Sequence, residues 1–328
     1  MDSRVIRDFL LRHSTAILFI AIFVFFGLQA PRFFEPESVS NIVKQASFTG
    51  VVAVGMTFVL LTAGIDLSVG SNMYLSAMAA GYLLQVPELQ NEIGVVVAIA
   101  LAVAVGATFG AVNAFCIVNL RITPFMVTLA TLVAGRGLGT AITESFGIQF
   151  PPVFLRFGAS SILGIPMPII VFAIVVATAH LVLTRTRFGR QVYAVGNDPE
   201  AARRAGIPVR RITFSVYVIC GTCAAIGGVM LIALIGRLNQ TFGVGKEFDV
   251  ITAAVLGGTS LFGGVGSALG AVVGAVLVQM VQAGMVFISV NIYLQPMLLA
   301  VIIFLAVFFD SLRESRLLKL RRRRIRPD

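Results

Sequence analysis

The sequence predicts an all-α integral membrane protein, a polytopic bundle of about ten transmembrane helices with glycine-broken segments. Composition is the first observation: 58% of the 328 residues are hydrophobic, 12% are charged, and the mean hydropathy is +0.96. Soluble domains carry about 25% charged residues, so a soluble fold of this composition would expose large apolar patches. Long apolar runs and clustered basic residues are the second and third observations. Together they predict a single transmembrane domain over residues 1–328.

The apolar runs have the length that a membrane-crossing helix needs, about 17 to 25 residues. Such continuous runs favour helices over a membrane barrel, whose strands alternate in segments of about ten residues. The first run follows a basic segment, as in a signal peptide, but no Ala-x-Ala-like site closes it before Pro31. We therefore interpret it as a retained span. The run at 248–262 is too short to cross as a regular helix. We expect spans near residues 15–30, 45–64, 69–86, 94–118, 124–142, 166–184, 212–236, 248–262, 266–288 and 292–309.

Basic residues gather before the first run, in the loop 185–211 and in the tail 313–328. Alternating spans place all three segments on one side of the membrane, and an excess of Lys and Arg marks the cytoplasmic side. We therefore expect cytoplasmic N- and C-termini in a multi-pass protein of the bacterial inner membrane. The net charge of +10 then reflects contact with anionic lipid headgroups. Nucleic-acid binding by the tail is the alternative, and we do not expect it.

Two glycine-rich segments interrupt the apolar runs, at Ala63–Ser71 and at Leu256–Ser267. Glycine-interrupted spans in corresponding halves of a transporter point to its substrate path, where polar side chains satisfy the freed backbone groups. Ordinary tight turns at the membrane surface are the alternative, and the sequence leaves both open. Asp66 in the first segment either caps the helix that follows it or contacts a solute, and the cap is the favoured interpretation.

Three glycines at intervals of four residues, Gly266, Gly270 and Gly274, predict a close approach of helix backbones. Packing within the chain is the favoured explanation. An interface between subunits is the alternative.

The sequence contains no catalytic constellation and no set of metal ligands, so we expect no enzyme activity, metal or cofactor in this chain. Gly243-Val244-Gly245-Lys246 resembles the end of a phosphate loop, but Gln240 and Glu247 replace required residues on either side. Cys220 and Cys223 have redox-type spacing within an apolar run, where a thiolate is disfavoured, so we interpret them as packed residues. The energy for transport must come from elsewhere.

The basic loop 185–211 contains the signals of a short helix. Asn197 or Asp198 can cap it, Pro199 suits its first position, and Gly206 with Pro208 ends it. The small residues between them would let a partner protein close over the backbone. A helix lying on lipid is the alternative, but its apolar face would consist only of alanines and Ile207.

Four segments carry a resemblance to a known family: AGIDLSVGS at 63–71, VTLATLVAGRGLG at 127–139, GRQVYAVGNDPEAARRAGI at 189–207 and AAVLGGTSLFGGVGS at 253–267. In this order they resemble the sugar-type permeases of bacterial ABC importers, such as the ribose and xylose permeases. These belong with the branched-chain amino-acid permeases in one larger family. The blocks extend over residues 40–310 and are specific as a set.

The resemblance implies a second permease copy, identical or different, a cytoplasmic double-cassette ATPase that binds ATP, and a periplasmic sugar-binding protein. It also implies that the segment 197–207 is the coupling helix that docks on the ATPase, although Asn197-Asp198-Pro199 departs from the expected approach to it. The predicted ATPase-coupling residues are Asn197, Glu200, Ala201, Ala202, Arg203 and Gly206. Polar residues in and beside the apolar runs give the predicted substrate path: Asp66, Ser68, Ser71, Asn72, Asn113, Thr128, Thr259 and Gln279.

The leading functional hypothesis is ATP-driven import of a monosaccharide or related polyol. An amino-acid permease of the related branch is the alternative within the same class. An ion-coupled secondary carrier is the alternative from another class, and the scarcity of acidic residues in the spans disfavours it.

Overall fold

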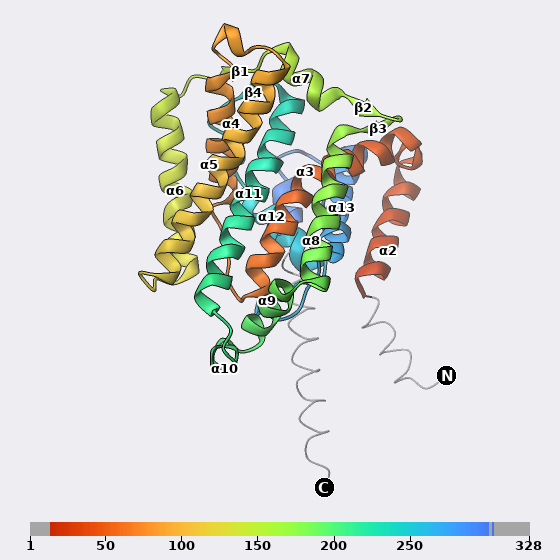
Figure 1. Cartoon of the computed structure of the whole chain (residues 1–328). Coiled ribbons are helices and arrows are strands. Elements are labelled where there is room, and N and C mark those ends of the chain that lie inside the picture. The colour runs from red at the N-terminus through yellow and green to blue at the C-terminus, as the bar shows by residue number, and fades with distance from the viewer. Residues whose placement is uncertain (1–13, 302–303, 305–328) are drawn as a thin grey trace, which may run out of the picture.

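The computed structural model describes residues 14–301 and 304, and these form a bundle of helices of unequal length (Figure 1). The basic tail 313–328, the first basic cluster and the end of the last expected span lie outside the described residues. The chain is helical again from residue 295 to 301. The main helices are α2 (Ser14–Gln29), α3 (Pro36–Leu61), α4 (Val69–Leu83), α5 (Glu92–Val118), α6 (Pro124–Thr143), α8 (Met167–Arg185), α11 (Val209–Ile235), α12 (Lys246–Leu256) and α13 (Ala268–Phe287).

Each expected span up to 266–288 coincides with one of these helices. Six of the described helices are long and apolar enough to cross a membrane, namely α3, α5, α6, α8, α11 and α13. The prediction of a polytopic helical membrane protein is therefore confirmed. Helix α12 has 11 residues, or about 16 Å of helix, roughly half of a bilayer core. The expectation that this segment cannot cross as a regular helix is also confirmed.

Helix α3 forms the centre of the bundle, and every residue from Ala46 to Leu61 is buried. The helices α8, α11, α12 and α13 surround it. Helices α5, α6 and α8 leave most of their apolar surface uncovered, as expected for helices whose solvent is lipid or another subunit. Gly270 and Gly274 approach the backbone of α12 so closely that a side chain on either would overlap it. The glycine series therefore packs within the chain, as favoured.

One end of the bundle carries structure that the sequence did not predict. The connection between the spans expected at 124–142 and 166–184 contains helix α7 (Pro152–Ala159) and three of the four strands that form two short pairs. Strand β1 (Ile148–Gln149) pairs antiparallel with β4 (Arg237–Leu238), and β2 (Ser161–Ile162) pairs with β3 (Ile165–Pro166). Two-residue strands carry too little periodicity to be recognised in sequence. The 3-10 helices η1 (Pro31–Phe34) and η2 (Pro87–Leu89) complete the connections at this end.

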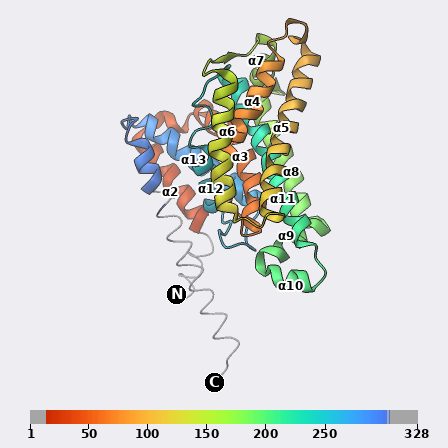
Figure 2. The same ribbon diagram turned by 90° about the vertical axis from the view of Figure 1, so that its left-hand side faces the viewer.

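The opposite end carries helices α9 (Arg187–Asn197) and α10 (Pro199–Arg204), which project from the bundle (Figures 1 and 2). The chain leaves α3 and reaches α4 through residues 62–68, which we call the first break. Residues 257–267, the second break, connect α12 to α13. Gly70 at the start of α4 and Gly243 just before α12 are so close that a side chain on either would overlap the other's backbone. The beginnings of these two short helices therefore meet inside the bundle.

Candidate functional site

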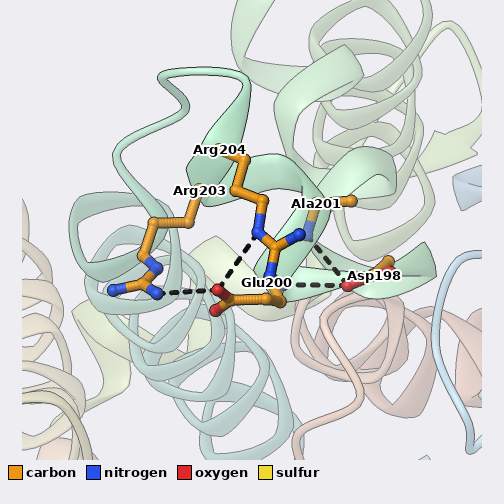
Figure 3. A network of polar contacts seen from close by, with 5 residues as sticks. All are labelled: Asp198, Glu200, Ala201, Arg203 and Arg204. Atoms are coloured by element: carbon orange, nitrogen blue, oxygen red, sulfur yellow. Dashed lines mark hydrogen bonds and ion pairs between the residues drawn. The ribbon is translucent and has the colours of Figure 1, made fainter.

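Helix α10 is a short capped helix, as the sequence predicts. Asp198 is its N-cap, and its Oδ1 accepts hydrogen bonds from the amides of Glu200 (2.9 Å) and Ala201 (3.0 Å) (Figure 3). Pro199 occupies the first helical position, where its missing N–H costs nothing. The choice between Asn197 and Asp198 as the cap is thereby settled. Asn197 instead ends α9, and its Nδ2 donates to the Tyr193 carbonyl oxygen at 2.9 Å.

Three charged side chains form a network on the exposed face of α10 (Figure 3). The Glu200 carboxylate accepts a hydrogen bond from Arg203 at 2.7 Å and is 3.5 Å from the Arg204 guanidinium. The hydrogen bond from Arg203 lowers the pKa of Glu200, with smaller effects from the charge of Arg203 and the hydrogen bond from Arg204. Pairs this exposed contribute little to stability. They leave a defined charged surface that a partner protein can recognise.

Small residues make up the rest of the surface of α10. Ala202 is buried against the bundle, whereas Ala201 and Gly206 are exposed. Gly206 has a φ of +80°, the left-handed conformation that ends many helices and favours glycine. A Cβ on Gly206 would have no described atom within 4 Å. A larger side chain at this position would therefore extend away from the permease toward whatever docks on α10.

The end of α9 contacts the end of α3 and the second break, and we call this contact the joint. Gly196 approaches the Leu61 carbonyl oxygen and the Gly264 amide so closely that a Cβ would overlap them. The Gly264 amide itself donates to the Leu61 carbonyl at 3.0 Å, which ties the second break to the end of α3. The Tyr193 hydroxyl donates to the Gly266 carbonyl at 2.8 Å. Gly263 in the second break lies close to Ala63 in the first, so the joint reaches the first break through the second.

The polar residues of the first break bond to one another. Asp66 is buried, and its Oδ1 accepts hydrogen bonds from the Ser68 amide (2.9 Å) and the Ser68 hydroxyl (2.6 Å). The Asn113 amide donates to the Ser68 hydroxyl at 2.8 Å. The N-cap of α4 is Ser68, and no side chain caps this helix, so the expected capping role of Asp66 is wrong. Its carboxylate instead closes a turn with Ser68 just before α4.

Four further residues of the predicted path also lie inside the bundle. The Asn72 Nδ2 donates to the carbonyls of Gly106 (3.2 Å) and Gly221 (3.3 Å), and so joins α4 to α5 and α11. Ser71 and Thr128 bond to carbonyls of their own helical turns. The Thr259 hydroxyl is buried without a hydrogen-bond partner among the described residues. The structure therefore gathers these residues around the breaks rather than along an open channel.

Gln279 lies elsewhere, in a groove beside α12 and α13. The groove is a cavity of about 1160 Å³ bordered by α3, α12, α13 and residues 292–304. Sequence reasoning missed its other polar residues, although Gln282 one turn beyond Gln279 was a visible signal. The polar lining residues are Gln45, Lys246, Asp249, Gln279, Gln282 and Gln295. The part of the chain that the structure describes contains no cluster of three His, Cys, Asp or Glu residues able to hold a metal ion.

Comparison with known proteins identifies relatives over nearly the whole chain. Residues 38–307 match the family described as branched-chain amino acid transport system / permease component. The ribose import permease protein RbsC of Escherichia coli K12 is 34% identical over 313 residues, 94% of this chain and 96% of that protein. RbsC of Bacillus subtilis 168 is 35% identical over 302 residues, which cover 91% of this chain and 92% of that protein.

A permease for a second sugar has a similar identity and coverage. The D-allose transport system permease protein AlsC of Escherichia coli K12 is 34% identical over 309 residues, 92% of each chain. No solved structure matches the chain. The resemblance to sugar-type permeases is confirmed, and the chain belongs to the branched-chain amino acid transport system / permease component family, as a multi-pass protein of the inner membrane.

Proposed function

We propose that this chain is the membrane-spanning subunit of an ATP-driven importer that carries a monosaccharide or related polyol into the cytoplasm. The observation that carries the proposal is the joint, which connects an exposed, capped helix to both broken segments of the bundle. A partner that moves α10 would thereby act on the interior. The relatives named for ribose, allose and galactose favour a sugar over an amino acid, the alternative that the family description suggests.

The proposed partners follow from this role. A cytoplasmic double-cassette ATPase docks on α10 and hydrolyses the ATP, because this chain supplies no nucleotide site and acts as a transport subunit. A periplasmic sugar-binding protein delivers the sugar at the end of the bundle that carries α7. A second permease copy completes the pore, and lipid surrounds the pair. The predicted coupling residues keep their role, with Asn197 acting through the end of α9 and Asp198 added as the cap.

The proposed topology has ten spans and cytoplasmic N- and C-termini, as the sequence predicts. Two features support the orientation. Helix α10 lies in the basic loop 185–211, which the positive-inside rule places in the cytoplasm. The loop that carries α7 lies at the opposite end, where the binding protein would dock (Figure 1).

We also propose a division of the predicted path residues. Those around the breaks, from Asp66 to Thr128, hold the broken helices in place through bonds to their own chain. Gln279 lines an open cavity, and we assign it to the route of the solute.

Co-purification with one substitution tests the proposal. We expect the tagged permease to bring a double-cassette ATPase with it from detergent, and Gly206→Leu to abolish both this association and ATP-dependent uptake. Gly164→Leu is the matched control for the association with the ATPase, because Gly164 has nearly the same φ, +79°, and equally open surroundings in the loop at the other end. A permease that purifies alone and transports in liposomes under an ion gradient would instead be a secondary carrier.

A further inference from the structure

The groove beside α12 and α13 joins polar side chains from four separate segments of the chain. Gln45 comes from α3, Lys246 and Asp249 from the first turn of α12, Gln279 and Gln282 from one face of α13, and Gln295 from the last described helical segment. We propose that this groove is a transit site for a neutral polyhydroxylated solute. The inference rests on the proposed function, since the solute would be the imported monosaccharide.

Six of the seventeen residues that line the groove are polar, and lipid tails alone would leave these side chains without partners. Amide groups placed in hydrocarbon without partners cost several kcal/mol each, so intramembrane polar residues face protein or a water-filled cavity. Within the described part of the chain, the Gln279 side chain makes no hydrogen bond although it lies in a helix of span length. Its amide is therefore available to water or to a solute.

The charges in the groove compensate one another, which favours a neutral ligand. The Lys246 ammonium lies 2.8 Å from the Asp249 carboxylate, and the Gln282 amide donates to the other carboxylate oxygen at 3.2 Å. Both charges are thus satisfied within the wall of the groove, and neither calls for an ionic partner. What remains for a ligand is the amides of Gln45 and Gln279, together with the amide oxygens of Gln282 and Gln295, whose nitrogens already donate within the chain. Amides both donate and accept hydrogen bonds and so match hydroxyl groups.

Apolar side chains complete the lining. Phe248 is 59% exposed on α12, and Val286 and Ile292 border the same cavity. A monosaccharide presents C–H faces between its hydroxyls, so a mixed wall of aromatic and amide groups fits it. The volume of about 1160 Å³ exceeds the usual 300–1,000 Å³ of a small-molecule site. The cavity is larger than one monosaccharide requires, as expected of a site that must release its ligand.

Helix α12 connects the groove to the joint. Its first turn supplies Lys246 and Asp249, and its last residue leads into the second break, which contacts Gly196 and Tyr193 of α9. A displacement of α9 would therefore move one wall of the groove along about 16 Å of rigid helix. The transit site and the ATPase-docking helix are joined by a single element.

Accessibility of a single cysteine tests whether the groove is an aqueous route. Gln279→Cys in the complete transporter is treated with a membrane-impermeant cationic methanethiosulfonate, and Ile174→Cys on the lipid-facing surface of α8 is the control. We expect the groove cysteine to react at least about tenfold faster than the control. Equal rates would overturn the proposal, because lipid or the second subunit would then fill the groove.

Uptake by leucine variants tests the ligand. Labelled D-ribose, D-allose and D-galactose are offered to cells, and the sugar that the wild type imports is used. We expect Gln279→Leu and Gln282→Leu each to lower uptake about three- to tenfold while the ATPase still co-purifies, as loss of one ligand hydrogen bond implies. Gln85→Leu, at the other end of the bundle, should leave uptake unchanged. Unchanged uptake in both groove variants would refute the site. A wild type that lacks an ATPase or imports no sugar would instead refute the proposed function. The cysteine reactivity would then show by itself whether the groove is an aqueous route.

Discussion

Removal of one hydroxyl group at the joint should weaken the link between ATP hydrolysis and transport. The Tyr193 hydroxyl donates to the Gly266 carbonyl oxygen at 2.8 Å, and it ties α9 to the second break. Tyr193→Phe removes this bond and keeps the ring that packs against the core. The variant is therefore expected to fold and to reach the membrane normally.

The size of the effect follows from the environment of the bond. An intramolecular hydrogen bond contributes about 0.5–1.5 kcal/mol net. Tyr193 and Gly266 are both partly exposed, so water can replace the lost donor and the full cost of a buried unpaired carbonyl does not arise. About 1 kcal/mol corresponds to roughly a fivefold change in the equilibrium between joined and separated positions of α9.

Transport per ATP hydrolysed is the informative assay. With the ATPase and binding protein reconstituted, Tyr193→Phe should keep its ATPase activity but move about two- to fivefold less sugar per ATP. Tyr82→Phe is the matched control, because the Tyr82 hydroxyl donates to the Ile142 carbonyl at 2.9 Å at the opposite end. A wild-type ratio in Tyr193→Phe, or an equal loss in Tyr82→Phe, would show that the joint does not transmit the motion.

Three further predictions concern the cap, the packing of the first break and the loop before α12. Asp198→Ala removes the N-cap of α10, at a cost of about 1 kcal/mol, and should weaken ATPase binding about fivefold in a titration, whereas Asn91→Ala, which uncaps α5, should not. Asn72→Leu removes the bonds that join α4 to α5 and α11 and leaves the Ser76 hydroxyl without its acceptor, and a loss of about 1–3 kcal/mol should lower the apparent melting temperature in detergent by several degrees. Arg136→Met removes the guanidinium that donates to two carbonyls of the loop 239–245, so this loop should become more sensitive to protease added from the outside, and unchanged cleavage would contradict that role.

The positions of the spans could be predicted because membrane thickness sets helix length. Each long apolar run became a helix, and the short run near 248 became the half-length helix α12. Helix α10 could be predicted equally well, because Asp198, Pro199 and Gly206 begin and end the helix through local conformation and need no tertiary contact. Helix α9 was missed although it carries a signal, an N-cap Thr186 that accepts from the Gly189 amide at 3.1 Å.

The functional use of polar residues inside the spans could not be predicted in the same way. Asn72 and Gln279 look alike in the sequence, as single amides in apolar runs. Asn72 bonds to carbonyls far along the chain, 34 and 149 residues away, whereas Gln279 faces a cavity whose other walls come from three distant segments. Only tertiary packing distinguishes an amide that holds helices together from one that faces a solute.

The joint explains why the glycine-rich breaks belong at the α10 end of the bundle. A continuous helix would transmit a push as a rigid body, whereas a break lets two halves of a span move separately. Gly196 is in contact with Leu61 at the end of α3, just before the first break, and with Gly264 in the second break. Because the Gly264 amide also donates to the Leu61 carbonyl, a displacement of α9 would act on the end of α3 and on the second break together. A single docking event on α10 is thus positioned to act on both halves of the bundle together, which is the requirement for opening a route at one end while closing it at the other.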